Sequence, residues 1–310
     1  MDFVAIDFET ANQKHNSACA IGITPVKDGI VGPTIHRLIR PPELEFSPWN
    51  TRVHGITERD VINCPTLLDL WPEFSSLIEG NLVVAHNASF DVSVLRHSLD
   101  AVGLSVPRFS YLCSLKLSRQ LWPELASHSL GFLSVTHSIP LEHHNAGSDS
   151  FAAAQLVLLG AKKKGITCPR DLAENCGVTV GEVFSNDSWT PVSAPSYRSA
   201  KTFELQLPSA YDVSTHEFFG KLVAFTGTMT TLTRNDAMKV VEQLGGIPKT
   251  SVSKGTDYLV VGVLDVRSLA EGTSESAKLK DAKALREKGG NVKIITDSDF
   301  MKMISTVKQD

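Results

Sequence analysis

The residues that point most clearly to chemistry are two carboxylates near the N-terminus, Asp7 and Glu9. They lie in Phe3–Thr10, a run of apolar, largely β-branched or aromatic residues that predicts a β-strand. Side chains two positions apart on a strand share a face, so these carboxylates are held together, and their repulsion is relieved by a bound cation. Ligand sets made only of oxygen favour Mg²⁺ or Mn²⁺. An exposed acidic strand face would show the same pattern, so the pair alone does not decide.

A third carboxylate, Asp91, follows a second short apolar strand. The segment Asn81–Asp91 runs from that strand through a polar turn into an amphipathic helix. Asp91 falls in the first turn of this helix, where an acid also complements the helix dipole. The context places Asp91 at the end of a sheet strand, where ligands of α/β proteins bind.

A fourth carboxylate, Asp149, lies in or near the first turn of a helix of good helix formers that continues through residues 150–159. His144 precedes it by five residues, in the irregular segment that leads into the helix. Histidine has a free pKa near neutrality, which suits a general base that removes a proton from water. His143 is an adjacent candidate for the same role.

The order and local contexts of these five residues resemble the DEDDh class of 3′–5′ exonucleases. Members of this class include the proofreading epsilon subunit of bacterial DNA polymerase III, RNase T and oligoribonuclease. The shared motifs are D-x-E-T, A-H-N-A-S-F-D and H-x-A-x-x-D, and Val53–Thr57 is similar to the connector after the family's third strand. The resemblance covers about residues 1–165. The register of the third motif favours His144 over His143 as the general base.

The resemblance implies hydrolysis of phosphodiester bonds at 3′ ends, with release of nucleoside monophosphates. Two divalent ions, Mg²⁺ or Mn²⁺, about 3.5–4 Å apart can stabilise the attacking and leaving oxygens of such a reaction. By resemblance, Asp7 bridges both ions and Glu9 holds the first. Asp91 and Asp149 complete the cage.

Four residues around the proposed ligands are expected to contact the terminal nucleotide: Phe8, Thr10, Asn87 and Phe90. Phe8 and Thr10 flank the ligands where the family's backbone and side chains cradle that nucleotide. Phe90 precedes Asp91, where a ring can stack on or wedge against a base at a single-stranded end. Phe90 could instead anchor the helix in the core.

Composition predicts a globular chain of two domains. It has 310 residues, five cysteines at irregular spacing and a net charge of −4. The odd cysteine count indicates reduced thiols rather than a disulfide framework or a zinc site, and the apolar runs are too short to span a bilayer. The N-terminus enters the catalytic strand at once and leaves no room for a cleavable signal, so we expect a cytoplasmic protein. The net charge argues against coating nucleic acid through bulk electrostatics.

The first domain, residues 1–184, is expected to be an α/β, ribonuclease-H-like exonuclease domain, a mixed sheet flanked by helices. Three antiparallel strands come first, near residues 3–10, 17–26 and 34–39, and a strand–helix–strand unit follows from Leu82. Residues 169–184 indicate a small helix and turn appended to this domain. Residues 185–215 are rich in Ser, Pro and Thr and predict an extended linker with little packing of its own.

The remaining residues, 216–310, predict a second small α/β domain with the order β-α-β-β-α-β-α. It resembles a BRCT domain with a parallel four-stranded sheet, most closely the kind in bacterial NAD-dependent DNA ligases and in the large clamp-loader subunit. The supporting residues include F-T-G-T at 225–228 and the pair Gly245-Gly246. One departure is Phe300, which takes the place of a tryptophan usual in the last helix and can fill the same core position.

Many BRCT domains hold a phosphate at the turn after the first strand, and the matching residues here are Thr226, Gly227, Arg234 and Lys278. The hydroxyl of Thr226 and the N–H of Gly227 would donate, and the two cations would clamp the phosphate. A DNA 5′-phosphate is favoured over a phosphopeptide because a single BRCT unit is joined to a nuclease. The alternative is a domain that binds a protein partner or acts as a spacer.

The sequence therefore predicts a metal-dependent 3′–5′ exonuclease that trims single-stranded or frayed DNA 3′ ends in repair or replication. One alternative is a 3′–5′ exoribonuclease, which a comparison of DNA and RNA oligomers would separate because the 2′-hydroxyl is the discriminating group. Another is a catalytically weak recruitment module that acts through the BRCT domain. No membrane partner is expected.

Overall fold

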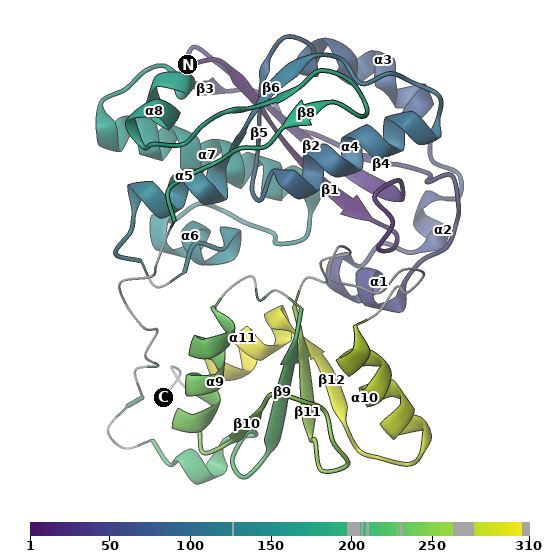
Figure 1. The fold of residues 1–310 in the computed structure, drawn as a ribbon, viewed down its shortest axis with the longest axis vertical. Coiled ribbons are helices and arrows are strands. Elements are labelled where there is room, and N and C mark those ends of the chain that lie inside the picture. The colour runs from purple at the N-terminus through teal and green to yellow at the C-terminus, as the bar shows by residue number, and fades with distance from the viewer. Residues whose placement is uncertain are drawn as a thin grey trace. The chain divides into compact units, whose positions relative to one another are not determined.

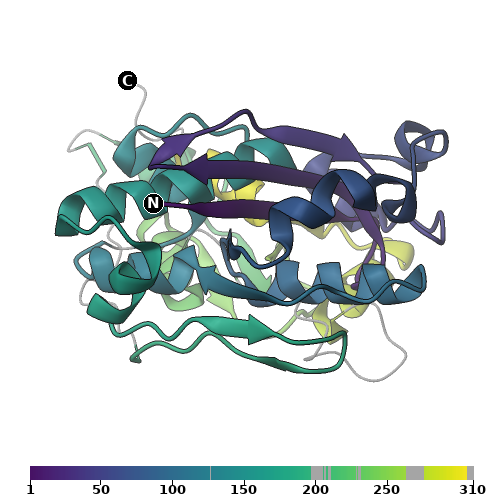
Figure 2. The ribbon, with the colours of Figure 1, turned by 90° about the horizontal axis from the view of Figure 1, so that it is seen from above.

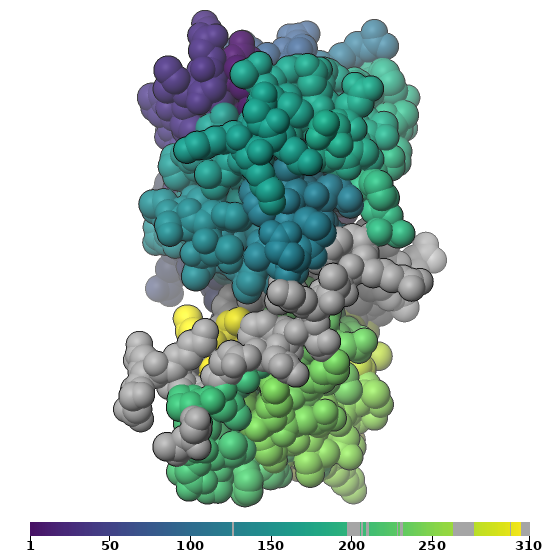
Figure 3. Space-filling view, turned by 90° about the vertical axis from the view of Figure 1, so that its left-hand side faces the viewer, coloured from purple at the N-terminus to yellow at the C-terminus, as the bar shows by residue number. Residues whose placement is uncertain are grey.

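The computed structural model describes residues 1–125, 127–196, 205, 207–208, 211–227, 229, 232–262 and 276–305, and draws the others in grey (Figure 3). These residues divide into two compact units, residues 1–123 with 130–198, and residues 124–129 with 199–310. Each unit is described by itself. Within the described ranges, no helix combines the length and apolar character needed to cross a bilayer.

The first unit is a mixed sheet with helices packed against it (Figure 1). Its strands are β1 (Phe3–Thr10), β2 (Ala18–Lys27), β3 (Ile30–Val31), β4 (Ile35–Leu38), β5 (Leu82–Ala85), β6 (Phe109–Cys113), β7 (Gly181–Val183) and β8 (Trp189–Thr190). Its helices are α1 (Pro48–His54), α2 (Glu58–Val61), α3 (Leu67–Ile78), α4 (Ser89–Ala101), α5 (Ser114–Leu121), α6 (Leu130–His137), α7 (Ala146–Lys164) and α8 (Pro169–Asn175).

The strand order is β3-β2-β1-β5-β6-β7-β8, and β4 also pairs with β2. β1 pairs antiparallel with β2 and parallel with β5, and β5 pairs parallel with β6. The strands β1 and β2 lie side by side in both views (Figures 1 and 2). This arrangement confirms the predicted α/β class and the three antiparallel strands followed by a strand–helix–strand unit.

The start of α7 lies directly on β2, and a glycine permits this contact. Gly22 pairs with Asp7 in the sheet. A Cβ atom on Gly22 would lie 1.9 Å from the carbonyl oxygen of Ala146, so no larger residue fits without displacing the helix. The hydroxyls of Thr24 and Ser150, 2.9 Å apart, add a buried hydrogen bond between the same two elements. The first turn of α7 is therefore fixed beside Asp7.

Residues 185–196 differ from the expectation of a linker with little packing. Trp189 pairs with Val183, which makes β8 a further strand of the sheet. Val192 is buried, and the guanidinium of Arg96 lies 3.7 Å from the centre of the Trp189 ring. Backbone pairing and the cation–π contact hold this segment in place. The segment in turn covers the otherwise open edge of β7. Residues 197–204, 206 and 209–210 of the predicted linker lie outside the described residues.

The second unit is a four-stranded parallel sheet in the order β10-β9-β11-β12, which confirms the predicted BRCT architecture. Its elements are η1 (Val213–Thr215), β9 (Leu222–Thr226), α9 (Arg234–Gln243), β10 (Ile247–Lys249), β11 (Tyr258–Val261), α10 (Ala277–Glu287), β12 (Lys293–Thr296) and α11 (Asp297–Ser305). Phe300 is fully buried, with its ring centre 5.6 Å from those of Phe218 and Phe225. Phenylalanine thus fills the core position expected for an aromatic residue.

Replacing Gly22 by alanine tests the contact between β2 and α7. We expect Gly22→Ala to destabilise the first unit by about 3 kcal/mol, the upper end of the usual cost of overpacking, because the added methyl meets main-chain atoms that cannot rotate away. Urea unfolding followed by tryptophan fluorescence measures this unit alone, since all four tryptophans, at 49, 71, 122 and 189, lie in it. Ile30→Ala, at a side chain 72% exposed on β3, is the matched control. A Gly22→Ala chain as stable as that control would contradict the packing.

Candidate active site

Carboxylates from three elements meet at the end of β1. Ligand oxygens of Asp7 and Glu9 on β1 and of Asp149 on α7 all lie within 4.8 Å of one another. Asp91, in the first turn of α4, joins them from another side, because its Oδ1 accepts a hydrogen bond of 3.1 Å from the backbone N–H of Phe8. Asp91 and Asp149 are 2% and 4% exposed. The structure thus brings together the four acids that the sequence proposes as ligands.

The charges acting on these carboxylates come from one another. Burial, followed by Asp91, Asp149 and Glu9, raises the pKa of Asp7 well above its usual value. Burial, followed by Asp149 and Asp91, raises the pKa of Glu9 in the same direction. Burial raises the pKa of Asp91 to about 8, although the N–H of Phe8 stabilises its ionised form. The raised pKa values of Asp7, Glu9 and Asp91 show that a divalent cation would relieve the repulsion in this cluster.

The donor set fits hard divalent cations. Asp7, Glu9 and Asp149 offer only oxygen atoms, and such ligands suit Mg²⁺ or Mn²⁺. The buried, mutually repelling acids are the observation on which the fit depends.

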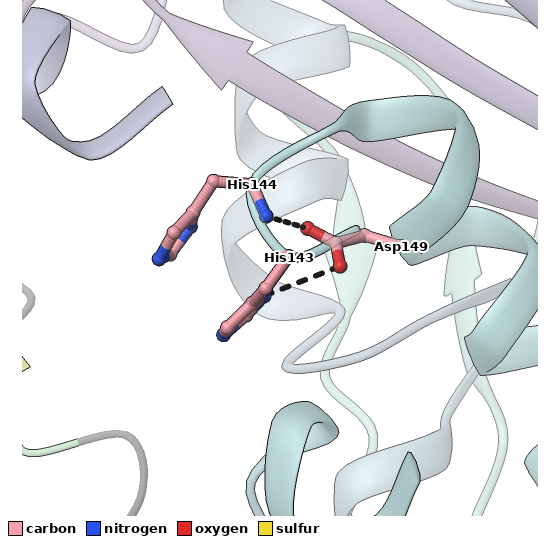
Figure 4. A group of neighbouring side chains, drawn as sticks. All are labelled: His143, His144 and Asp149. Carbon is pink, nitrogen blue, oxygen red and sulfur yellow. Dashed lines mark hydrogen bonds and ion pairs between the residues drawn. The ribbon is translucent and has the colours of Figure 1, made fainter. Parts of the chain in front are cut away.

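Both histidines of the pair before α7 contact Asp149 (Figure 4). The backbone N–H of His144 donates to Asp149 Oδ2 over 2.9 Å, and His143 Nδ1 lies 3.2 Å from Asp149 Oδ1. His144 has φ 67°, a left-handed conformation that turns its N–H toward the carboxylate. Burial, then His143 and His54, lowers the pKa of His144 to about 3, so its imidazole is neutral near pH 7.

The helix α1 adds residues that the sequence analysis did not assign to the site. His54 Nδ1 accepts the N–H of Ile56 over 3.0 Å, so its Nε2 carries the proton and donates to the carbonyl oxygen of Thr10 over 3.1 Å. Burial lowers the pKa of His54 despite that carbonyl, which favours the neutral ring. Asn50 donates to the same carbonyl oxygen over 2.9 Å. The connector motif at 53–57 was the only sequence signal for this support of the β1 end.

The four residues proposed to contact substrate occupy different environments. Phe8 and Thr10 are buried, with exposed fractions of 3% and 6%. Alternation along β1 turns these two side chains away from the face of Asp7 and Glu9, so the contact of Phe8 and Thr10 with a nucleotide stays a prediction that only their main chain could fulfil. Asn87 is exposed, with φ 71°.

Phe90 is half-buried and belongs to a small aromatic cluster on the surface. Its ring meets the edge of His15, with ring centres 5.8 Å apart. His15 in turn lies 5.5 Å from His97 of α4. Phe90 therefore packs against His15 and still retains exposed surface.

In the second unit the four proposed phosphate contacts lie around the end of β9. The hydroxyl of Thr226 donates to Ser276 Oγ over 2.8 Å, and Gly227 has φ 73°. Arg234 donates to the carbonyl oxygen of Gly227 over 2.7 Å, and Lys278 Nζ donates to that of Phe225 over 2.9 Å. Burial, then Arg234, lowers the pKa of Lys278, as expected for two cations held close together.

Two family models match this chain. Residues 4–157 match the model described as exonuclease, RNase T, and residues 214–304 match the model described as BRCA1 C Terminus (BRCT) domain. The first match falls in the first unit and the second match in the second unit. Each match spans most of the described elements of its unit.

The chain is similar to curated proteins called DNA polymerase III PolC-type. It is 34% identical over 174 residues to that of Thermotoga petrophila, covering 53% of this chain and 12% of the relative. It is 27% identical over 263 residues to that of Streptococcus sanguinis, covering 84% of this chain and 16% of the relative. The chain thus matches only a small part of these relatives.

Among solved structures, one similar chain is Exonuclease X in complex with 5′ overhanging duplex DNA. It shares 28% identity with a TM-score of 0.46, covering 56% of this chain and 99% of that chain. Exonuclease I is also similar, at 18% identity and a TM-score of 0.47, covering 56% of this chain and 42% of that one.

The repulsion between the carboxylates makes a prediction about pH. The pKa of Asp91 rises from an ordinary 3.8 to about 8, so the folded metal-free protein binds more protons than the unfolded chain between these values. Its stability therefore falls as pH rises through this window. We expect Asp7→Asn to stabilise the metal-free first unit at pH 8, and to do so less at pH 5, because the amide removes one repelling charge.

Urea unfolding in EDTA, followed by tryptophan fluorescence at both pH values, measures this difference. Mg²⁺ should restore the stability of the parent at pH 8 and have less effect on Asp7→Asn. Glu79→Gln, at an exposed acid after α3, is the matched control and should show no such dependence. Equal stability of Asp7→Asn and the parent at pH 8 would contradict the proposed repulsion between the carboxylates.

Proposed function

We propose that this chain, whose residues 4–157 belong to the RNase T exonuclease family and whose residues 214–304 form a BRCT domain, is a DEDDh-type 3′–5′ exonuclease. The observation that carries this proposal is the meeting of Asp7, Glu9 and Asp149 within 4.8 Å, beside two histidines. Hydrolysis would release nucleoside monophosphates from a 3′ end.

The four carboxylates serve as the metal cage. Two divalent cations bound there would supply charge stabilisation to the attacking and leaving oxygens. Asp7 is central to the cage because its neighbours include the other three acids, Glu9, Asp91 and Asp149. Asp91 and Asp149 are aimed by backbone N–H groups, so their orientation is set before any substrate arrives.

His144 serves as the general base that takes a proton from the attacking water. Its imidazole is neutral near pH 7, as a base must be, although a pKa of about 3 makes it weak in the free protein. A phosphodiester bound beside the ring brings negative charge, which favours the imidazolium and raises that pKa. The Asp149 contact with the main chain of His144 holds the base next to the cage.

We propose DNA 3′ ends, single-stranded or frayed, as the substrate, in repair or replication in the cytoplasm. The similarity to polymerase III proteins named PolC-type supports DNA rather than RNA. Asn87 and Phe90 are the residues we assign to the terminal nucleotide, since both retain exposed surface next to Asp91. RNA 3′ ends are the alternative substrate. A catalytically weak recruitment module is the alternative function.

A second binding function is proposed for the BRCT domain. Arg234 and Lys278 place two positive charges close together at the end of β9, which is costly unless an anion joins them. We propose that this domain, of the kind found in DNA ligases, uses them with Thr226 and Gly227 to bind a DNA 5′-phosphate. A phosphate oxygen can replace the main-chain carbonyls that now accept from both cations.

Removal of a ligand or of the base tests the exonuclease directly. We expect Asp149→Ala to abolish Mg²⁺-dependent release of mononucleotides from 5′-labelled DNA, since the cage loses a shared carboxylate. We expect His144→Ala to slow it about 10²–10⁴-fold, the usual contribution of a general base. Lys162→Ala, at an exposed lysine in the last turn of α7, is the control and should keep the parent rate.

DNA and RNA oligomers of one sequence, assayed in parallel, separate the two substrates. Faster degradation of the RNA would replace DNA by RNA in the proposal. Release from DNA and RNA that is unchanged in Asp149→Ala would discard the active site itself.

The phosphate site of the BRCT domain is tested by binding of the full chain, in EDTA, to duplex DNA with and without a 5′-phosphate. We expect Lys278→Ala to weaken binding to the phosphorylated end about tenfold or more, because one charge-assisted hydrogen bond is lost. Lys280→Ala, at an exposed lysine of the same helix, is the control. Equal affinity of the parent for both DNAs would end this assignment.

A further inference from the structure

A second cluster of metal-ligating side chains adjoins the carboxylate cage. Candidate ligand atoms of His143, His144 and Asp149 all lie within 4.8 Å of one another. The two imidazole rings stack with centres 4.0 Å apart and planes 12° apart. Figure 4 shows both rings projecting to the same side, away from the ribbon of α7. Only Asp149 belongs to both this cluster and the cage of oxygen ligands.

The chemistry of the second cluster differs from that of the first. Imidazole nitrogen suits Zn²⁺, Cu²⁺ and Ni²⁺, whereas sets of carboxylate oxygens suit Mg²⁺ and Mn²⁺. The separation of 3.2 Å between His143 Nδ1 and Asp149 Oδ1 is close to the distance of about 3.3–3.4 Å between two ligands of one tetrahedral zinc ion. The placement that gives these two atoms a hydrogen bond is therefore nearly the placement that they need to bind one zinc ion together.

The cluster is open to ions from solvent. The His143 side chain is 33% exposed. Position 131 on α6 faces the same ring and is a glycine, whose missing Cβ would lie 3.5 Å from His143 Cδ2 and 3.8 Å from Nε2. Three protein ligands leave a fourth position of a tetrahedral zinc ion for water.

We propose that His143, His144 and Asp149 form an inhibitory site for Zn²⁺ that adjoins the Mg²⁺ cage and shares only Asp149 with it. This inference depends on the proposed exonuclease function for its consequence, but not for the binding itself. Bound zinc takes the imidazole of His144 and an oxygen of Asp149, which the proposed reaction needs as base and as ligand. Bound zinc is therefore expected to inhibit the hydrolysis that Mg²⁺ supports.

The direct test measures zinc binding with the catalytic cage disabled. Asp7→Asn breaks the cage of oxygen ligands and leaves the second cluster intact. We expect the full-length Asp7→Asn chain to bind one Zn²⁺ by calorimetry, and Co²⁺ as a spectroscopic probe with the visible absorption of a low-coordinate ion. Adding His143→Ala should weaken zinc binding about tenfold or more, the range seen even for residues that only orient a ligand.

His97→Ala in the same Asp7→Asn background is the matched control, because it removes an exposed imidazole outside the cluster. Its zinc affinity should equal that of Asp7→Asn. Equal zinc affinity with and without His143 would overturn the site. Loss of zinc binding in Asp7→Asn alone would also overturn it, by placing the ion in the carboxylate cage.

The activity arm adds zinc chloride to parent enzyme with Mg²⁺ held constant, and each variant is compared with its own zinc-free rate. We expect zinc to inhibit the parent, and His143→Ala to need about tenfold more zinc for the same fractional inhibition. A rate that rises with zinc, or equal inhibition of both chains, contradicts the inhibitory role. A parent without nuclease activity discards the exonuclease proposal and leaves the binding result standing.

Discussion

Electrostatic repulsion between four carboxylates at the end of β1 is the constraint on which the rest of the first unit depends. Asp7, Glu9, Asp91 and Asp149 come from three elements, and none gains from meeting the others while the site lacks a cation. Other interactions must therefore hold them together. The register of β1 on β2, the contact of α7 over Gly22 and the buried hydroxyl pair of Thr24 and Ser150 do so.

The main chain orients the acids, and this leaves their charge available. Asp91 accepts the N–H of Phe8, and Asp149 accepts the N–H of His144, whose left-handed backbone costs about 1–2 kcal/mol. A neutral N–H donor orients a carboxylate without cancelling its charge. A lysine or arginine side chain would cancel that charge. The fold thus holds the carboxylates in a defined geometry in which small cations can take the place of the protons that the repulsion favours.

Much of the fold follows from local patterns, and what the patterns missed depends on packing between distant segments. Alternation in β1 predicted the strand, and it also places the buried Phe8 side chain on the face opposite Asp7. His54 lies in α1 and is separated from its partner Thr10 by 44 positions in the sequence. Only the path of the chain after β4 brings the two residues together. The meeting of the four acids was foreseen from motif order, because strand ends and helix starts share one edge of the sheet.

The pairing of β8 with β7 determines where the first unit ends as an independent piece. A recombinant fragment stopped at residue 184 would leave the hydrogen-bonding groups of β7 bare and remove Val192 from its buried position. Bare strand edges pair with one another, so we expect such a fragment to self-associate. Fragments for crystallisation or NMR should therefore extend beyond Ser193, which bridges to Thr179.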